Sequence, residues 1–257
     1  MNILVLVKAV PLVGDERLGE DWQTDRTNLE ANGADEYCLE KALQLTETHG
    51  GEVGVLSVGP ATASEALRKA LAMGAERAYH VVDDALAGSD IRATVRVLQA
   101  ALEKIEFDIL FSGADSSDGR GGVVGAALAA RLGLAYLSNA ADVEVVGGSR
   151  LRVKRLSATG HELLEAAMPA LVMGTQLLGE PRYPSLRGIM AARKKETVTW
   201  TLAELGIEPG AVGAAAAHTQ VLSAEAPVRR AGATLIKASP DEAAAQVVAF
   251  LSERGLV

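Results

Sequence analysis

The stretch DILFSGADSSDGRGGVVGAALAARL, residues 108–132, decides the fold. It begins with an apolar run that predicts a buried strand over Asp108–Ser112, and it ends in a segment that predicts a helix over Gly121–Leu132. A glycine-rich turn joins the two. A strand that enters a helix through such a turn is typical of parallel α/β sheets, in which helices cross over between neighbouring strands.

The same alternation extends through the first two-thirds of the chain. Short apolar runs predict strands, and apolar residues at every third or fourth position predict helices. The predicted strands are Ile3–Val7, Val53–Val58 and Ala78–Val82, and the predicted helices cover Asp35–His49, Ala63–Leu71 and Ile91–Ile105. We therefore expect a doubly wound, mostly parallel, Rossmann-like α/β sheet.

The pattern changes after Ala141. Val143–Val146 and Leu151–Arg155 flank two glycines, which predicts a β-hairpin added to the parallel sheet. Two further strands are predicted at Leu163–Ala166 and Ala170–Gly174.

The last third of the chain has weak periodicity until its final helix. From Thr197 it is punctuated by Ala, Gly and Pro yet stays moderately apolar, which favours a segment that lies on another chain. The α/β domain, with a partner recognition loop, is predicted at residues 1–190, an extended arm that wraps a partner subunit at 191–238, and a C-terminal helix at 239–257. That helix follows Ser239 and Pro240 and is expected to bury Ala244, Val247, Val248 and Leu251.

Composition limits the chemistry of the chain. Its 257 residues are 49% hydrophobic and 23% charged, which excludes disorder and predicts one large or two small domains with a sizeable core. One cysteine excludes an internal disulfide and a cysteine-rich zinc or iron–sulfur site. The net charge of −8 disfavours a nucleic-acid partner. No apolar run is long enough for a secretory signal or a membrane span, so we expect a cytoplasmic protein without membrane insertion.

The glycine-rich loop, Ser112–Gly125, is the best candidate for a binding site. Gly119, Gly121 and Gly122 let a ligand approach the backbone closely, and the free N–H groups of the first helical turn favour an anion. Arg120 could add its charge to a phosphate. The loop lacks the Gly-Lys-Ser/Thr of a Walker A motif, and it does not follow the first strand as a Rossmann fingerprint does. The alternative is a strand–helix turn that binds nothing.

Catalytic and metal-binding candidates are few. The histidines, His49, His80, His161 and His218, are scattered without metal-ligand spacing, so no metal site is predicted. Cys38 lies on the apolar stripe of its helix, as a small buried hydrophobe does. The acidic pairs Asp83–Asp84 and Asp115/Asp118 are explained by loop solvation as well as by acid–base chemistry. We predict no catalytic residue.

A second candidate site, the docking segment, comprises Gly179–Glu196. Two prolines stiffen its start, and Ser185 can cap a short helix. The predicted docking residues are an apolar group and a cationic border: Tyr183, Pro184, Leu186, Ile189, Met190, Arg193, Lys194 and Lys195. The alternative is an ordinary amphipathic turn that packs on its own core.

Six blocks of the sequence carry a family resemblance. They are LVKAVP (6–11), NGADEY (32–37), LSVGP (56–60), ALAMGA (70–75), the loop 113–125, and EPRYPSL (180–186) running to Lys195. Together they resemble the beta subunit of electron transfer flavoproteins along almost the full chain, and the last block is the most specific.

The resemblance implies a heterodimer with an electron transfer flavoprotein alpha subunit. In that family the beta subunit has no catalytic residues of its own and buries an adenine nucleotide, usually AMP. The redox-active FAD is held mainly by the alpha subunit. The heterodimer carries electrons from flavin dehydrogenases, such as the acyl-CoA dehydrogenases of fatty acid oxidation, to a membrane quinone oxidoreductase.

The resemblance also assigns site residues. The AMP pocket maps onto Leu6, Asn32, Val58, Gly113, Gly121, Gly122, Val123 and Val124, and the backbone N–H groups of the last four would hold the phosphate. With Asp118, Gly119 and Arg120 of the same loop, these are the predicted cofactor-binding residues. Leu186 corresponds to the leucine that anchors the donor dehydrogenase, and Arg193, Lys194 and Lys195 match the basic end of the recognition segment.

The chain also departs from the family pattern. Leu12 stands where many members have Asp, and residues 118–123 read DGRGGV where many members read DGDTAQ. Backbone contacts to a phosphate tolerate such changes, but the choice between AMP and a second FAD, as in electron-bifurcating relatives, stays open. Two other hypotheses are a stand-alone nucleotide sensor similar to universal stress proteins and an ATP pyrophosphatase. The first leaves the docking segment without a purpose, and the second requires a phosphate loop after Ile3–Val7.

Overall fold

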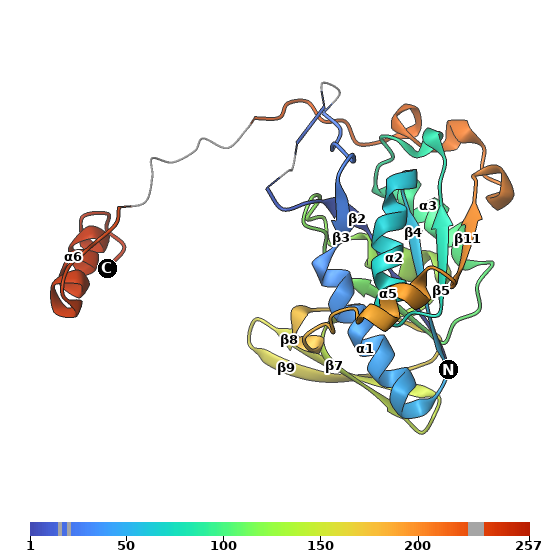
Figure 1. The fold of residues 1–257 in the computed structure, drawn as a ribbon, viewed down its shortest axis with the longest axis horizontal. Helices are drawn as coiled ribbons and strands as arrows, with labels where there is room; N and C mark the ends of the chain where they lie inside the picture. Colours follow the sequence, from blue (N-terminus) through green and yellow to red (C-terminus); the bar gives the residue numbers. More distant parts are fainter. Residues whose placement is uncertain (15–16, 20–21, 226–233) are drawn as a thin grey trace. The chain divides into compact units, whose positions relative to one another are not determined.

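The computed structural model describes residues 1–14, 17–19, 22–225 and 234–257. These residues form two units, Met1–Val221 and Leu222–Val257. Within the described part of unit 1 the main sheet has nine strands in the order β11-β5-β4-β1-β6-β10-β7-β8-β9 (Figure 1). The strand bounds are β1 Asn2–Leu6, β4 Glu52–Val58, β5 Arg77–Val81, β6 Ile109–Gly113, β7 Ala135–Val146, β8 Arg150–Ser157, β9 Gly160–Ala167, β10 Ala170–Gly174 and β11 Glu196–Trp200.

The sheet is parallel from β11 to β7 and antiparallel from β7 to β9. The helices are α1 Gly33–His49, α2 Ser64–Met73, α3 Ile91–Leu102, α4 Val124–Leu132 and α5 Leu186–Ala192. A separate two-stranded ribbon, β2 Ala9–Pro11 and β3 Leu29–Ala31, follows β1. The predicted doubly wound α/β fold and its added hairpin are confirmed, and β9 extends the hairpin to three antiparallel strands.

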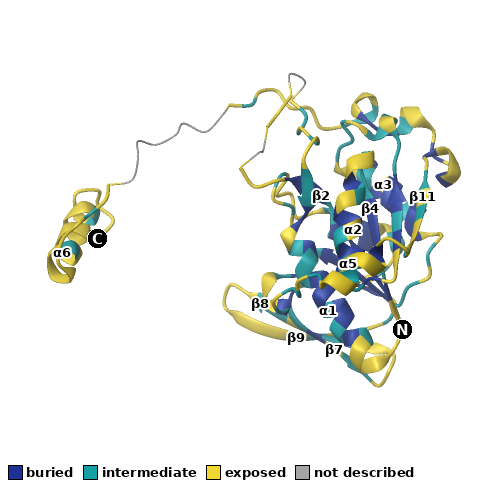
Figure 2. Cartoon of the chain, in the orientation of Figure 1, coloured by how far each residue is buried: buried dark blue, intermediate teal, exposed yellow. Residues whose placement is uncertain are grey.

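Alternation along the strands divides the core into two layers. Ile3 and Val5 of β1 lie in the layer that contains Leu39 of α1, whereas Leu4 lies in the layer that contains Leu98 of α3. The helices α1 and α2 therefore cover one face of the sheet, and α3 and α4 cover the other. Figure 2 shows the buried residues concentrated on the strands and on the inward sides of these helices. Continuous apolar strands are what a sheet covered on both faces requires.

The segment that was expected to begin the arm at residue 191 belongs instead to unit 1. Its β11 pairs in parallel with β5 at the edge of the sheet. Leu202, Leu205 and Ile207 are buried in the same core layer as α3. The segment that leaves unit 1 starts at Leu222, and residues 226–233 of the predicted arm lie outside the described residues. That the arm wraps a partner stays a prediction.

The C-terminal helix α6, Pro240–Ser252, begins where the sequence predicts. Ser239 and Glu242 form a reciprocal capping box at its start. The expected burial of its apolar stripe is not observed, because Ala244, Val247 and Val248 are exposed and Leu251 is only half-buried. Among the described residues of unit 2, this stripe has no core to pack on.

Candidate functional site

Three predicted cofactor-binding residues lie at the carboxyl ends of adjacent strands. Leu6 ends β1, Val58 ends β4 and Gly113 ends β6, and β1 lies between the other two strands. The chain order changes direction between β1 and β6, which is where an open α/β sheet forms its ligand crevice. The Leu6 side chain is buried in the core layer beneath α3 and α4, whereas Val58 is half-buried.

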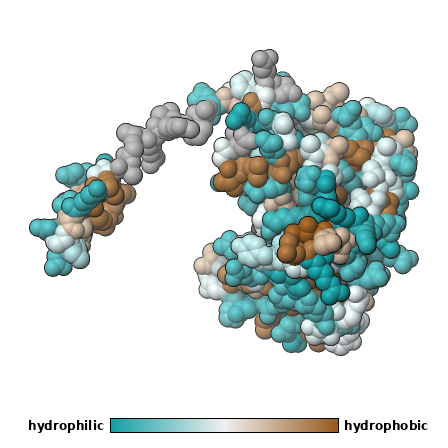
Figure 3. All heavy atoms as spheres, in the orientation of Figure 1, coloured by the Kyte–Doolittle hydropathy of each residue, from teal (hydrophilic) through white to brown (hydrophobic). Residues whose placement is uncertain are grey.

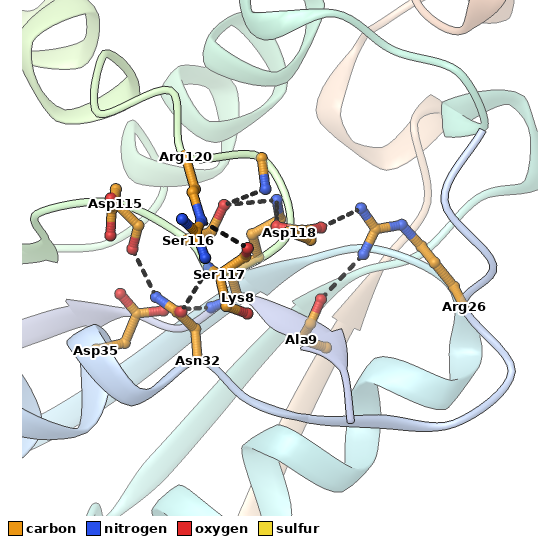
Figure 4. Close-up of polar contacts among 11 residues, drawn as sticks. Lys8, Ala9, Arg26, Asn32, Asp35, Asp115, Ser116, Ser117, Asp118 and Arg120 are labelled. Atoms are coloured by element: carbon orange, nitrogen blue, oxygen red, sulfur yellow. Dashed lines mark hydrogen bonds and ion pairs between the residues drawn. The ribbon is translucent and has the colours of Figure 1, made fainter. Parts of the chain in front are cut away.

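Asn32 holds the glycine-rich loop (Ser112–Gly125) from the side of β3. Its amide Nδ2 donates to the carbonyl oxygen of Asp115 at 2.8 Å, and its Oδ1 accepts from the Ser117 N–H at 3.2 Å (Figure 4). Asn32 is buried, so both polar ends of its side chain find partners in the loop. The structure thus brings this predicted site residue to the loop as a backbone clamp.

A carboxylate between two cations forms the second anchor of the loop. The Asp118 side chain is 4% exposed; its Oδ1 is 2.6 Å from Lys8 Nζ and its Oδ2 is 3.0 Å from Arg26 Nη2. Burial alone would raise the pKa of Asp118, but the hydrogen bond and charge of Lys8, together with Arg26, hold that pKa below its usual range. Asp118 was predicted to bind the cofactor directly; here its carboxylate is used to shape the loop.

Lys8 and Arg26 are site residues that the sequence did not single out. Lys8 Nζ also donates to Ser116 Oγ at 3.0 Å, and Arg26 Nη1 donates to the Ala9 carbonyl at 3.0 Å (Figure 4). Lys8 follows β1 and Arg26 lies between β2 and β3, so both reach the loop from the N-terminal part of the chain. Lys8 lies within the block LVKAVP, which was the only available signal for it.

Asp35, near the start of α1, bridges β6 and the segment after β1. Its Oδ2 accepts from the Lys8 N–H at 2.8 Å and its Oδ1 accepts from the Gly113 N–H at 3.1 Å. Burial raises the pKa of Asp35 to about 7, although these hydrogen bonds oppose the shift. Gly113 is required here because a Cβ at this position would lie 2.3 Å from Asp35 Oδ1.

The N-terminus of α4 is open toward the ligand side of the loop. Its N-cap, Val123, supplies no side-chain hydrogen bond, whereas Asp90 and Ser185 cap α3 and α5 with their own side chains. The residues Gly121, Gly122 and Val123 are exposed, and a Cβ on Gly122 would approach only the Ala114 carbonyl oxygen, at 3.4 Å. Uncapped N–H groups beside glycines fit a phosphate group, which would supply the missing acceptors.

Arg120 is exposed, and its backbone and side chain both bond within the loop. Its N–H donates to the Ser116 carbonyl at 2.8 Å and its Nε donates to the Ser117 carbonyl at 3.4 Å. Its φ of 45° lies in the left-handed region, which the hydrogen bonds of the turn hold. Gly119 donates its N–H to Ser116 Oγ, so both residues help to close the turn.

The docking segment (Gly179–Glu196) presents apolar side chains to solvent. Tyr183, Leu186 and Met190 are 89%, 83% and 71% exposed, and Ile189 is also exposed. Leu186, Ile189 and Met190 lie on α5, and Tyr183 precedes it. The apolar patch on α5 is seen in brown near the middle of Figure 3. Exposed apolar groups of this size on and beside one short helix fit the predicted docking role, which stays a prediction. Pro184 is half-buried, while Arg193 and Lys194 are exposed beside the patch.

Arg182 fixes the start of the docking segment to α1. Its Nε donates to Glu40 Oε2 at 2.7 Å and its Nη2 to Glu40 Oε1 at 3.0 Å, while Nη1 donates to Glu47 Oε1 at 2.6 Å. The Glu40 side chain is 6% exposed, so this is a two-pronged pair with a nearly buried carboxylate. The sequence analysis quoted Arg182 only as part of the segment.

Lys195 and Gly188 fix the segment to α2. Lys195 Nζ donates to the carbonyls of Ala75 at 2.7 Å and Leu71 at 3.3 Å, so this predicted member of the cationic border points inward. A Cβ on Gly188 would lie 2.3 Å from the Ala72 carbonyl oxygen, which shows how closely α5 approaches α2. The apolar patch therefore stands on a rigid base.

Within the described ranges, no three His, Cys, Asp or Glu side chains gather where they could hold a metal ion. None of the helices in the same ranges has both the length and the hydropathy to cross a bilayer.

Comparison with known proteins gives a consistent family. A family model described as an electron transfer flavoprotein domain matches residues 22–205. The electron transfer flavoprotein subunit beta of Mycobacterium leprae is 42% identical over 90% of this chain and 91% of its own length. That of Mycobacterium tuberculosis strain H37Rv is 39% identical over 100% and 99%. The caffeyl-CoA reductase-Etf complex subunit CarD of Acetobacterium woodii is 33% identical over the full length of both chains.

Proposed function

The chain belongs to the electron transfer flavoprotein family, as a beta subunit, and from this premise we propose that it is the docking half of an electron-carrying heterodimer. Its partner is an alpha subunit, its donors are flavin dehydrogenases such as acyl-CoA dehydrogenases, and its acceptor is a membrane quinone oxidoreductase. The observation that carries the proposal is the apolar patch on α5, which is exposed and yet anchored to α1 and α2. An exposed patch on a fixed base binds a partner with little loss of conformational entropy.

In this proposal the glycine-rich loop holds AMP as a structural ligand. The backbone N–H groups of Gly121–Val124 would bind its phosphate, because α4 lacks a side-chain cap. Lys8 lies beside the loop and would add a positive charge, while Asn32 and Asp118 keep the loop in shape. AMP has no redox chemistry. FAD, held mainly by the alpha subunit, supplies that chemistry when bound.

The arm is proposed to bind the alpha subunit. Val247, Val248 and Phe250 of α6 are exposed. Among the described residues of unit 2, none packs over them to form a core. A helix with a strong capping box and an unburied apolar stripe is expected to fold fully against a partner.

The docking role is tested by Leu186→Ala. Removing an 83% exposed leucine costs the chain little stability, but loss of a central interface side chain is expected to reduce the efficiency of flavin reduction by an acyl-CoA dehydrogenase about tenfold. The matched control is Leu163→Ala, which removes a similarly exposed leucine, 65%, from β9. Equal rates for the two variants would refute the docking role, and loss of flavin in Leu186→Ala would make the residue structural.

A second candidate function is electron bifurcation, with FAD in place of AMP. It is favoured by the similarity, over the full length of both chains, to the caffeyl-CoA reductase-Etf complex subunit CarD. The nucleotides released by denaturing the purified heterodimer distinguish the two functions. One FAD and one AMP support the simple carrier, whereas two FAD per heterodimer support bifurcation.

A further inference from the structure

A groove between α3 and α4 lies outside the site described above. It has a volume of about 450 Å³ and is lined by Arg92, Ala93, Arg96, Arg131, Ala211, Ala216 and His218. An adjoining hollow of about 350 Å³ shares Arg92, Arg131 and His218, and it is also lined by Asp90, Thr219 and the apolar side chains of Ile91, Val95 and Ala127. Hollows of this size accommodate small organic ligands.

The charge of the groove is unbalanced. In the part of the chain that the structure describes, Arg92, Arg96 and Arg131 have no carboxylate within 4.0 Å. Arg131 Nε donates instead to the amide oxygen of Gln99, at 2.6 Å. Arg92 and Arg96 are one helical turn apart, where like charges repel. Three unneutralised guanidinium groups stand out in a chain with a net charge of −8.

His218 gives Arg92 a hydrogen-bond partner but leaves its charge unneutralised. Arg92 Nη1 lies 3.0 Å from His218 Nε2, and a guanidinium can only donate, so this nitrogen accepts. One acid, Asp90, lines the adjoining hollow, so the three arginines outnumber the carboxylates across the two hollows, and Asp90 is held by backbone N–H groups. It accepts from the Ala93 N–H at 2.9 Å and from the His218 N–H at 2.7 Å, as the cap of α3.

The outer wall of the groove is firmly built. Gly213 donates its N–H to Ser89 Oγ at 2.9 Å, and Ala214 donates to the Ala87 carbonyl at 3.0 Å. Gly213 has a φ of 73°, and a Cβ on it would lie 2.3 Å from the Ala85 carbonyl oxygen. Such close approach fixes segment 213–218 against the turn before α3, so the groove is preformed.

We propose that this groove binds the phosphate or pyrophosphate group of a small anionic ligand, at a site that adjoins the glycine-rich loop near Ile91 and Gly121 but has none of the loop's residues in its lining. Arginine matches phosphate oxygens with paired N–H donors, and the groove offers three such side chains around one hollow. The apolar wall at Ile91 and Val95 accommodates the uncharged part of an organic phosphate. This inference does not depend on AMP binding at the loop.

Titration calorimetry of the purified protein, with any copurifying subunit and nucleotide retained, tests the proposal. The probes are inorganic pyrophosphate and ADP; tighter binding of ADP identifies an organic phosphate as the ligand, and equal binding identifies the free anion. Arg96→Ala and Arg131→Ala are each expected to weaken binding about tenfold or more. The matched control is Arg68→Ala, an exposed helix arginine paired with Glu65 outside the groove, which should bind as the wild type does.

Four results would overturn the proposal. They are no saturable binding of either probe to the wild type, equal weakening in Arg68→Ala, loss of bound nucleotide in the groove variants, and loss of a copurifying subunit in those variants. The third would move the binding to the glycine-rich loop. The fourth would make the groove a protein contact instead of a small-ligand site. Far-ultraviolet circular dichroism checks that each variant is folded.

Discussion

Arg182→Met removes the charge that fixes the docking segment to α1 while keeping most of the aliphatic stem. The guanidinium makes two hydrogen bonds to Glu40, whose side chain is 6% exposed, and two to the exposed Glu47. The Glu47 contacts contribute at most about 1 kcal/mol, because water competes for both partners. The Glu40 half decides the effect, since the variant leaves a nearly buried carboxylate with Gln44 as its remaining side-chain partner.

Breaking a buried ion pair by removing one partner costs about 3–5 kcal/mol. Because the Arg182 side chain is 36% exposed, we expect a value at or below the bottom of that range, about 2–3 kcal/mol of unfolding free energy. At a urea m-value of about 2–3 kcal/mol per molar, the unfolding midpoint should fall by about 1 M. Urea unfolding followed by circular dichroism measures it, with Arg68→Met as the exposed matched control, expected to change stability by less than about 0.5 kcal/mol.

The double variant Glu40→Gln/Arg182→Met decides whether the buried charge is the cause. Removing both charges should restore part of the loss, because no unpaired carboxylate then remains in the interior. A midpoint for Arg182→Met within 0.2 M of the wild type, a threshold set at roughly a fifth of the expected shift, would refute the reasoning. So would a double variant that loses the sum of the two single losses.

The pH dependence has a definite sign. Burial acts to raise the pKa of Glu40, but the hydrogen bonds from Arg182 and Gln44 outweigh it and hold the pKa below its usual value. A lowered pKa contributes stability that is present above the unfolded value of about 4.3 and is lost as the pH falls through the folded value. The stability gap between the wild type and Arg182→Met should therefore be widest near neutral pH and should narrow as the pH falls below about 4.

Two further variants test the glycine-rich loop. Gly122→Val places a branched side chain at a φ of 60° and should abolish retention of bound nucleotide. The control Gly133→Val, at a φ of 67° in open space, carries a similar backbone strain and should retain the nucleotide. Chromatography of the released nucleotide measures both. Asp118→Asn should destabilise the chain by about 2–3 kcal/mol and loosen the nucleotide, whereas Asp142→Asn, from a half-exposed pair with Lys41, should cost less than about 1 kcal/mol. Because the pKa of Asp118 is lowered, its contribution to the free energy of unfolding is lost as the pH falls below about 3.9. Asp118→Asn should therefore lose less stability than the wild type on acidification. An equally steep loss in both would contradict the role given to Asp118.

The sequence predicts the part of the fold that depends on local pattern. β1 and β6 are continuous apolar runs. Because the two strands pair in parallel, their ends at Leu6 and Gly113 lie at the same edge of the sheet. β11 was missed because an edge strand is largely exposed and so lacks a clear apolar period. Leu202, Leu205 and Ile207 are buried, but they lie in short turns whose sequence has neither helical nor strand periodicity, so no pattern predicts their burial.

The anchors of the candidate site could not be predicted for a different reason. Asp118 lies 110 positions from Lys8 and 92 from Arg26, so no local spacing signals their contact. The same holds for Arg182 and Glu40, which are 142 positions apart. The glycine spacing predicted an open loop, which the structure has, but it did not predict that Asp118 pairs with Lys8 and Arg26 or that Lys195 donates to backbone carbonyls. A charged residue in a predicted site can pair with another part of the same chain instead of binding a ligand or partner. Only the tertiary structure distinguishes these two uses.

One helix connects the two halves of the proposed function. At the start of α1, Asp35 binds the N–H of Gly113, where the glycine-rich loop begins. Further along the same helix, Glu40 and Glu47 hold Arg182, where the docking segment begins. A nucleotide that binds only the folded loop stabilises every contact on which that loop depends, including the position of α1. In the proposed function, the nucleotide pocket and the apolar patch would therefore be mechanically linked through α1, and nucleotide binding would set how firmly the patch is held.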